Sequence, residues 1–403
     1  MTFKVAYVLD CFPVISQTFI SDEIYYLLKH KNIEIEIFSL NRSDEDVHHE
    51  RVSEILDDMT VNYLRSPGAR TKIRILLKRF LSNPIKTINQ LYSFTKAGQE
   101  RWINLDALYY AEMIQQHGID HIHSHFADQA AKSSMAISMW TGIPFTFTTH
   151  GYDVFFQPPE NYVQLADKAK YVFAISHYNK AYLIDKFQLQ ENKVKVIYCG
   201  IDYETYHGIT YKPQNIGARV SLLTVARLHP VKGHKYLLEA LSILRERIDF
   251  EFDLYLAGDG SEMDFLKGLT EELKLTGLVY FLGNQSQSQV YDLLKECDCF
   301  VLPSISEGLG IVLLEAMASS RLVVAPAVNG VPELIIDNET GFLFKPEDSG
   351  SLADAIERAF SCSDRYAEII ETARSKVVRE FSKDKSIDLL VHYWDDAANE
   401  KQF

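Results

Sequence analysis

The chain of 403 residues carries 41 Lys and Arg against 55 Asp and Glu, and 47% of its side chains are hydrophobic. This length predicts two domains with cores large enough to fold without disulfides, and the composition excludes intrinsic disorder. The net charge of −14 excludes a nucleic-acid partner, because neutralising phosphates requires a basic face. Five scattered cysteines indicate a reducing compartment. No apolar run approaches the roughly 18 residues of a spanning helix, so we expect a cytoplasmic protein.

Short apolar runs alternate with amphipathic segments of helical length through the first half of the chain. Such alternation predicts a parallel sheet with helices on both faces, since strands buried on both faces read as continuous apolar runs. The predicted strands are Phe3–Leu9, Ile33–Leu40, Ile119–His125, Ile143–Thr149, Tyr171–Ile175 and Val194–Tyr198. The predicted helices include Ser21–His30, Leu105–His117 and His177–Phe187.

A basic stretch interrupts this acidic chain. From Met59 to Gln99 there is no Asp or Glu. Within it, five apolar residues recur at the spacing of one helix face, which predicts an amphipathic helix. Either this stripe packs on the first domain while the charges are solvated, or the helix lies in an anionic membrane surface. The stripe comprises Ile73, Leu76, Leu77, Phe80 and Leu81, and the cations are Arg65, Arg70, Lys72, Arg74, Lys78, Arg79, Lys86 and Lys96.

A segment without clear periodicity, Gly200 to Gly217, predicts a linker, after which the alternation restarts. Two α/β units joined by one linker would place a ligand-binding cleft between them. We predict domains over 1–205 and 206–382, with a helix in 383–403 that returns to the first domain. The strands expected in the second domain are Val220–Ala226, Phe252–Ala257, Leu278–Leu282, Cys299–Leu302, Leu322–Ala325 and Phe342–Phe344, and the helices are His234–Arg247, Ser261–Leu275 and Gln287–Glu296.

The first candidate site is the block from Thr224 to Gly233, where a strand ends and a helix begins. Backbone N–H groups and the helix dipole favour an anion at such a place. Arg227 and Lys232 add two cations, enough to hold a diphosphate. On the spacing alone, a solvated surface loop remains the alternative.

The second candidate site runs from Pro303 to Gly310 and continues into a helix. Its glycines let the backbone approach a ligand closely. Glu307 lies in the turn and Glu315 lies in the helix, eight residues later. These carboxylates either accept hydrogen bonds from polyol hydroxyls, or serve as a helix cap and a salt-bridge partner.

Together the two blocks resemble the retaining glycosyltransferases of family 4, which have the GT-B architecture of two Rossmann-like domains facing each other across a cleft. The family's Glu-x7-Glu pair is matched by Glu307 and Glu315. Its Arg-Leu-x-x-x-Lys-Gly segment is matched by Arg227-Leu228 and Lys232-Gly233. The segments Asn329 to Ile335 and Thr340 to Leu343 look like the family's Gly-x-Pro-Glu and Thr-Gly-x-Leu motifs.

The first half is similar to bacterial exopolysaccharide and colanic-acid type members of the same family. Two departures concern Ala226, which replaces a glycine common before the arginine, and the short Glu307 turn, which bears on the sugar that fits. The matching segments are Phe12-Pro13, Ser16 to Ile20, Glu23-Ile24, His123 to Ala127, Thr149 to Asp153, Ile175-Ser176 and Cys199 to Asp202.

The resemblance implies a role for each matched group. The basic pair would neutralise the departing diphosphate, Glu315 would bind the ribose, and Glu307 would hold the donor sugar with the Gly308–Gly310 backbone. His150 would reach that sugar from the opposite wall of the cleft. The turn at Ser16 to Thr18 would approach the phosphates and acceptor, and Asn284 with Gln285 would border the base. The implied catalytic residues are His150, Glu307, Arg227 and Lys232, and the implied donor-binding residues are Ser16, Gln17, Thr18, Gly258, Asn284, Gln285, Gly308, Leu309, Gly310, Ile311, Val312 and Glu315.

No cofactor and no divalent metal are expected, because in this family the basic pair replaces the metal. Asp44-Glu45-Asp46 has a metal-binding spacing, yet it lies in an acidic loop and we interpret it as solvated surface. His121, His123 and His125 alternate along one strand and share a side, a geometry suited to zinc. No Cys or fourth ligand is near in sequence, so a buried or cleft-lining histidine face is the favoured interpretation.

The sequence thus predicts a retaining, metal-independent hexosyltransferase. Its donor would be UDP-glucose, with UDP-galactose, UDP-N-acetylglucosamine and GDP-mannose as alternatives. Its acceptor would be a polysaccharide or lipid-linked oligosaccharide of exopolysaccharide biosynthesis. The stretch 65–86 would contact the anionic inner membrane face. The rival hypotheses are a nucleotide-sugar epimerase of the same fold, a non-catalytic nucleotide-sugar binding module and, more distantly, a saccharide phosphorylase.

Overall fold

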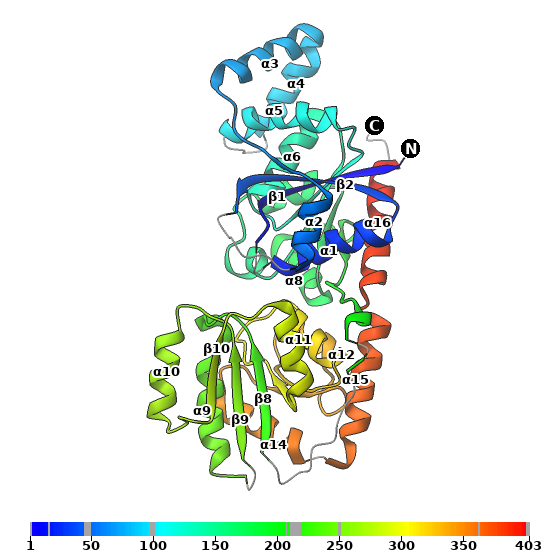
Figure 1. The fold of residues 1–403 in the computed structure, drawn as a ribbon. Helices are drawn as coiled ribbons and strands as arrows, with labels where there is room; N and C mark the ends of the chain where they lie inside the picture. Colours follow the sequence, from blue (N-terminus) through cyan, green and yellow to red (C-terminus); the bar gives the residue numbers. More distant parts are fainter. Residues whose placement is uncertain are drawn as a thin grey trace. The chain divides into compact units, whose positions relative to one another are not determined.

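The structure, a computed structural model, describes residues 2–14, 17–43, 50–96, 101–206, 208–209, 219–248, 251–361 and 363–399. The chain forms two compact units, Met1–Tyr198 with Ile387–Phe403, and Cys199–Ser386 (Figure 1). Both boundaries differ by a few residues from the predicted ones at 205/206 and 382/383. The reason is a backbone pairing in the second unit, where the Ile201 N–H donates to Phe381 and the Lys383 N–H donates to Ile201.

The first unit is built on a parallel sheet that has seven strands among the described residues, in the order β3-β2-β1-β4-β5-β6-β7. Neighbouring strands pair in parallel throughout, and the chain changes direction across the sheet between β1 and β4. The strands are β1 Phe3–Phe12, β2 Ile33–Arg42, β3 Val61–Tyr63, β4 His121–His125, β5 Phe145–Thr149, β6 Tyr171–Ala174 and β7 Val194–Val196.

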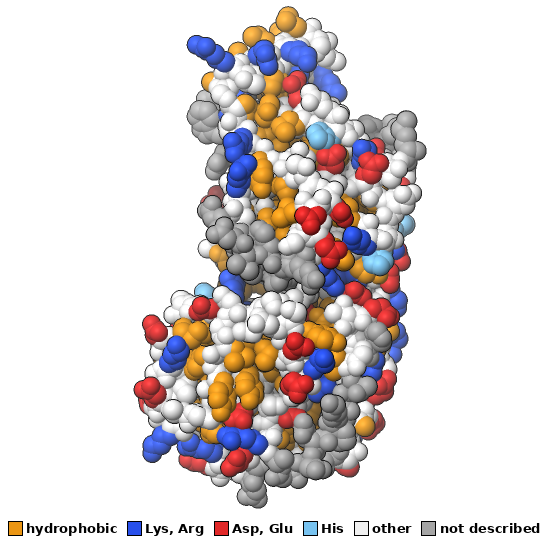
Figure 2. Space-filling model, viewed as in Figure 1, with side chains coloured by type: hydrophobic (Ala, Val, Ile, Leu, Met, Phe, Trp, Pro, Cys, Tyr) orange, Lys and Arg blue, Asp and Glu red, His pale blue; other side chains and the backbone are white. Residues whose placement is uncertain are grey.

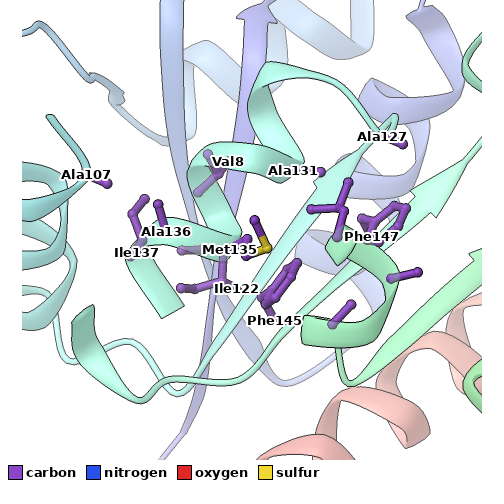
Figure 3. Close-up of a cluster of buried hydrophobic side chains, with 14 of the residues drawn as sticks. Val8, Ala107, Ile122, Ala127, Ala131, Met135, Ala136, Ile137, Phe145 and Phe147 are labelled. Atoms are coloured by element: carbon purple, nitrogen blue, oxygen red, sulfur yellow. The ribbon is translucent and has the colours of Figure 1, made fainter. Parts of the chain in front are cut away.

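Helices cover both faces of this sheet, which explains its continuous apolar strands. Ala6 and Val8 of β1 belong to one core cluster, and Val5, Tyr7 and Leu9 to another on the opposite face. Figure 3 shows part of the first cluster, in which side chains of α6 meet those of β4 and β5. The helices of this unit are α1 Thr18–His30, α2 Glu50–Asp58, α3 Ala69–Ser82, α4 Pro84–Lys96, α5 Arg101–Gln116, α6 Gln129–Thr141, α7 Tyr162–Lys168 and α8 His177–Phe187.

The C-terminal helix α16, Lys383–Asn399, packs on the second face with α1 and α2. Its Trp394 is fully buried, with its ring centroid 5.8 Å from that of Tyr7 and 5.1 Å from that of His123. Asp388 also forms an ion pair with Lys31 at 2.7 Å. These contacts explain why residues from Ile387 onward belong to the first unit.

The second unit contains a parallel sheet that has six strands among the described residues, in the order β10-β9-β8-β11-β12-β13. One face packs on α9, α10, α14 and α15. The strands are β8 Val220–Val225, β9 Phe252–Ala257, β10 Val279–Gly283, β11 Cys299–Val301, β12 Leu322–Pro326 and β13 Phe342–Phe344. The helices are α9 His234–Arg245, α10 Met263–Glu272, α11 Gln287–Glu296, α12 Ile311–Ala318, α13 Val331–Leu334, α14 Ser349–Ser361 and α15 Tyr366–Glu380.

These units confirm the predicted α/β class and every predicted strand, with ends that match or differ by at most three residues. Strand β3 was not predicted, because three residues are too few to show a period. Half of the predicted linker lies outside the described residues, as does Asp44-Glu45-Asp46. Among the described helices, none combines the length and apolar character that a transmembrane span requires.

Candidate functional site

The predicted donor residues of the second unit lie on loops that follow four neighbouring strands. Arg227 and Lys232 follow β8, Gly258 follows β9, and Asn284 follows β10, while the Glu307 loop follows β11. Because these strands are parallel, their carboxyl ends meet at one edge of the sheet. The chain reverses its direction of travel across the sheet between β8 and β11, and ligands of such sheets bind at that reversal.

The two charged motifs meet at this point. The Nζ of Lys232 lies 2.7 Å from the Oε2 of Glu307, and both side chains are largely buried. The hydroxyl of Ser304 donates to the same carboxylate oxygen at 3.2 Å. Glu307 is therefore an ion-pair partner and not a helix cap, since Gly310 precedes α12 without a side-chain cap.

Gly233 brings these two loops together. Its φ is +64°, and a Cβ at this position would lie 2.1 Å from the carbonyl oxygen of Pro303. Beside it, the backbone N–H of Ile305 donates to the carbonyl of Val231 at 2.9 Å. The motif therefore needs a glycine directly after Lys232. Without a Cβ at this position, the loop after β8 can approach the loop after β11 closely enough for Lys232 to reach Glu307.

The loop after β9 supports Arg227 in the same way. A Cβ at Gly258 would lie 2.0 Å from the carbonyl oxygen of Ala226, and the Leu228 N–H donates to Asp259 at 2.9 Å. Arg227 itself is exposed. Gly258 therefore packs against the backbone that presents an accessible cation, and its predicted contact with a donor remains a prediction.

Glu315 projects from α12 as a half-buried carboxylate and accepts a hydrogen bond from the hydroxyl of Tyr206 at 3.1 Å. Tyr206 is a buried residue that no sequence signal singles out, since it follows the first domain in a segment without periodicity. Its ring lies 6.0 Å from that of Tyr291 in α11. The carboxylate is thus held in place at the edge where Lys232 and Glu307 lie.

The remaining predicted residues of this unit differ in accessibility. Leu309 is buried, so only its backbone is available to a ligand, whereas Ile311 and Val312 at the start of α12 are half-buried. Asn284 is exposed. The side-chain amide of Gln285 donates to the carbonyl of Leu282 at 2.8 Å and so turns toward its own loop.

In the first unit, the predicted residues lie at the start of α1 and after β5. Ser16 lies outside the described residues, while Gln17 and Thr18 are half-buried at the first turn of α1. His150 follows β5, and its ring centroid lies 4.5 Å from that of Phe19 in α1. The structure therefore brings the α1 turn and His150 together at the carboxyl edge of the first sheet.

A buried carboxylate fixes the backbone around His150. Asp153 accepts from the His150 N–H at 2.8 Å, from the Ala127 N–H at 2.8 Å and from the Thr149 hydroxyl at 2.7 Å. Burial raises the pKa of Asp153, and these hydrogen bonds oppose that rise. The Thr-His-x-x-Asp segment thus ties the ends of β4 and β5 to each other.

The ring of His150 belongs to a buried chain of polar groups. Glu23 of α1 accepts from the Tyr7 hydroxyl at 2.7 Å and lies 3.0 Å from the Nε2 of His125. The Nδ1 of His125 lies 3.1 Å from the Nε2 of His150. Because a carboxylate only accepts, a neutral His125 carries its proton on Nε2 and accepts from His150. The Nδ1 of His150 is then an acceptor that suits a hydroxyl group.

These buried polar contacts also bear on the possible zinc site at His121, His123 and His125. Glu23, His123 and His125 each present a possible ligand atom, and these atoms lie within 4.8 Å of one another. The nitrogens of His123, however, lie 2.9 Å from the Thr146 hydroxyl and 3.3 Å from the Thr148 hydroxyl. These hydrogen bonds account for the position of His123, and a metal-independent site remains our prediction.

The buried histidines predict a loss of stability in acid. Burial lowers the pKa of His121 to about 3 and holds those of His123 and His150 well below 6.5. Below pH 6.5 the unfolded chain therefore binds protons that the folded unit does not. Burial raises the pKa of Asp128 to about 6, which opposes part of this effect. Burial also lowers the pKa of His234 in the second unit to about 4. We expect the free energy of unfolding of the full chain to be level above about pH 8 and to fall by about 2 to 4 kcal/mol per pH unit between pH 6 and 5.

Urea unfolding of the full chain at a series of pH values measures this slope. A free energy of unfolding that is constant or rises from pH 7 to 5 would contradict the assignment of neutral buried histidines. The His121→Gln variant is expected to show a shallower slope over the same range.

Comparison with known proteins identifies the chain. Residues 212–376 match the family model of glycosyl transferases group 1, and residues 87–205 match that of glycosyltransferase family 4. Together these matches cover more than half of the chain. The chain belongs to glycosyltransferase family 4.

Individual relatives agree with this membership. The uncharacterized glycosyltransferase MJ1178 of Methanocaldococcus jannaschii is 29% identical over 252 residues, 60% of this chain and 66% of that protein. The putative colanic acid biosynthesis glycosyltransferase WcaL of Escherichia coli is 26% identical over 399 residues, 94% of this chain and 96% of its own. Among solved structures, Anabaena HepE in complex with UDP-glucose has a TM-score of 0.72 and 20% identity, covering 98% of this chain and 99% of that one. The fold is therefore GT-B, with two Rossmann-like units.

Proposed function

We propose that this glycosyltransferase transfers a hexose from a nucleotide sugar, with retention of configuration, to a polysaccharide or lipid-linked oligosaccharide acceptor. The observation that carries the proposal is the Lys232–Glu307 ion pair beside an exposed Arg227, at the reversal point of the second sheet. Cleavage of the sugar–phosphate bond builds negative charge on the diphosphate. Fixed cations at that place stabilise the transition state more than the ground state.

The roles of the other residues follow from their chemistry. Glu307 holds Lys232 in position and offers its second oxygen to the sugar hydroxyls. Glu315 accepts hydrogen bonds from the ribose, beside the hydroxyl of Tyr206. In the first unit, the acceptor nitrogen of His150 takes a hydrogen bond from a hydroxyl of the donor sugar. The two cations make a divalent metal unnecessary for neutralising the diphosphate.

The names of similar proteins support particular substrates. HepE was solved with UDP-glucose, which favours UDP-glucose as the donor, ahead of UDP-galactose, UDP-N-acetylglucosamine and GDP-mannose. WcaL is named for colanic acid biosynthesis, and its match over nearly the whole chain favours an exopolysaccharide acceptor. The rival functions, an epimerase or a pure binding module, are less well supported. Neither requires a diphosphate-binding cation pair, Arg227 and Lys232, next to a sugar-binding carboxylate, Glu307.

A transfer assay by NMR tests this proposal. Full-length protein is incubated with UDP-glucose and a panel of lipid-linked and soluble oligosaccharides in EDTA. We expect UDP release that depends on the acceptor and an α-anomeric signal in the product. Conversion of the donor to its epimer without acceptor, or a β-anomeric product, would contradict the proposal, and phosphate-dependent release of a sugar phosphate would indicate the phosphorylase.

The buried chain behind His150 gives a separate prediction. We expect Glu23→Gln to lower kcat by about tenfold or more with little change in KM, because an amide no longer fixes the proton on His125. The matched control is Asp22→Asn on the same helix, whose carboxylate pairs with Arg51 at 2.9 Å and has no contact with the histidines among its described partners. Steady-state kinetics of Glu23→Gln and Asp22→Asn, compared once both variants are shown to have the same Tm, separates an effect on His150 from a general loss of stability. Equal kcat for both variants would show that the chain does not position His150.

A further inference from the structure

The helix pair α3 and α4 carries an apolar surface that the proposed site does not use. Of the predicted stripe, only Leu76 packs against the core, whereas the other four side chains are exposed. The structure therefore excludes the alternative in which this stripe packs on the first domain. The exposed apolar side chains of the pair are Ile73 (57%), Leu77 (55%), Phe80 (41%), Leu81 (80%), Ile85 (75%), Ile88 (53%) and Tyr92 (61%).

The opposite side of the pair is anchored to the first unit. Ile75 belongs to its core, and the ammonium of Lys72 forms an ion pair with Asp106. The guanidinium of Arg79 donates to the carbonyl of Trp140 at 3.0 Å, and the amide of Gln90 reaches the same carbonyl at 3.2 Å. The helices are thus held with their apolar outer face toward solvent, which is the reverse of an ordinary surface helix.

The exposed cations lie beside this apolar face. At 100° per residue, Ile73 and Leu77 lie at the centre of the outer face of α3, and Arg70, Arg74 and Lys78 form a row along one flank. Lys72 and Arg79 are held by partners in the first unit and do not belong to this row, whereas Lys78 stays 77% exposed although its ammonium lies 3.9 Å from Glu112. Figure 2 shows hydrophobic side chains and Lys or Arg side chains together over α3 and α4.

We propose that this α3–α4 surface binds the anionic face of a lipid bilayer. An exposed apolar helix face flanked by cations, in a stretch without Asp or Glu, has the complementary chemistry of such a surface. A second copy of this chain fits less well, because two such rows of cations would repel each other. The proposal goes beyond sugar transfer, and it holds or fails independently of the donor.

Binding combines two contributions that separate variants can remove. Lys and Arg side chains attract anionic lipid from a distance, and this attraction weakens in salt. The side chains of Leu77 and Leu81 then enter the boundary between head groups and acyl chains. We expect flotation with phosphatidylcholine–phosphatidylglycerol vesicles at low salt, and little flotation with pure phosphatidylcholine or at high salt.

The first variant reverses the cation row as Arg70→Glu, Arg74→Glu and Lys78→Glu. At about fivefold for each cation removed, we expect binding to the mixed vesicles to weaken by about 100-fold or more. The matched control reverses three exposed lysines of the second unit, Lys235, Lys267 and Lys295, and changes the net charge equally. Equal loss in both variants would show that net charge and not this surface decides binding.

A second variant keeps the charge and reports insertion directly. Leu77→Trp places an indole on the outer face, where it is exposed without lipid. We expect its emission to shift to the blue and to be quenched by brominated lipid only in anionic vesicles. No shift in the presence of bound vesicles, or stable dimers in lipid-free sedimentation that Leu81→Ser disrupts, would overturn the proposal in favour of a protein partner.

Discussion

Replacing Lys232 by alanine is expected to lower kcat for sugar transfer by about 100- to 1,000-fold, the usual cost of removing one fixed group that stabilises developing charge. Lys232 is held 2.7 Å from Glu307 in a largely buried pair, so its charge is already in place before the donor binds. Loss of the ammonium removes the cation that neutralises the departing diphosphate. Steady-state kinetics with the donor saturating measures this effect separately from donor affinity.

Two further variants make this test specific. Lys235→Ala removes a neighbouring half-exposed lysine whose partner is Glu239 at 3.7 Å, and we expect activity near that of the unmodified protein. Lys232→Ala combined with Glu307→Gln removes the unpaired carboxylate that the single variant leaves behind. If the double variant regained most of the activity, the lysine would serve only to neutralise Glu307 and its catalytic role would be wrong.

Gly233→Ala is expected to destabilise the second unit by about 3 kcal/mol and to abolish nucleotide binding. Part of this cost comes from a left-handed φ of +64°, and the larger part from a Cβ placed 2.1 Å from the Pro303 carbonyl oxygen. Relief of that overlap would move the β8 loop away from the β11 loop. The Lys232–Glu307 pair would then separate.

Two other glycines of the second unit separate the cost of the left-handed φ from the cost of the close contact with Pro303. Gly277 has φ of +82° with open space around it, so Gly277→Ala is expected to cost only about 1 kcal/mol. Gly268 lies within α10 with open space, and Gly268→Ala is expected to stabilise by about 1 kcal/mol. Urea unfolding gives all three values, and a Gly233→Ala variant no less stable than Gly277→Ala would contradict the close approach.

The strands of both sheets could be predicted because parallel strands that are buried on both faces appear in the sequence as continuous apolar runs, as in Val5 to Leu9. Strand β3 has only three residues and its assignment depends on pairing with β2. Along the chain, Arg227, Lys232, Glu307 and Glu315 could be selected from their motifs. Their convergence on one sheet edge follows from strand order, which no local pattern contains.

Other groups could not be predicted, because their roles arise from contacts between distant segments. Glu23 and His125 are 102 residues apart and meet only when α1 packs beside β4. Tyr206 reaches Glu315 across 109 residues. The alternating histidines were a signal of an unusual strand face, yet the threonines of β5 that contact His121 and His123 could not be identified from that spacing. The orientation of α3 was equally undecided, since an apolar stripe has the same spacing whether it faces a core or solvent.

Titration calorimetry of the full chain with UDP in EDTA tests most directly the claim that Arg227 and Lys232 form a metal-independent diphosphate site. We predict one UDP bound per chain in EDTA, no change in affinity on adding Mg²⁺ or Mn²⁺, and weaker binding by Lys232→Ala but not by Lys235→Ala. ADP and GDP should bind less tightly than UDP. Absence of binding by any of these nucleotides, or binding that requires the metal, would contradict the account.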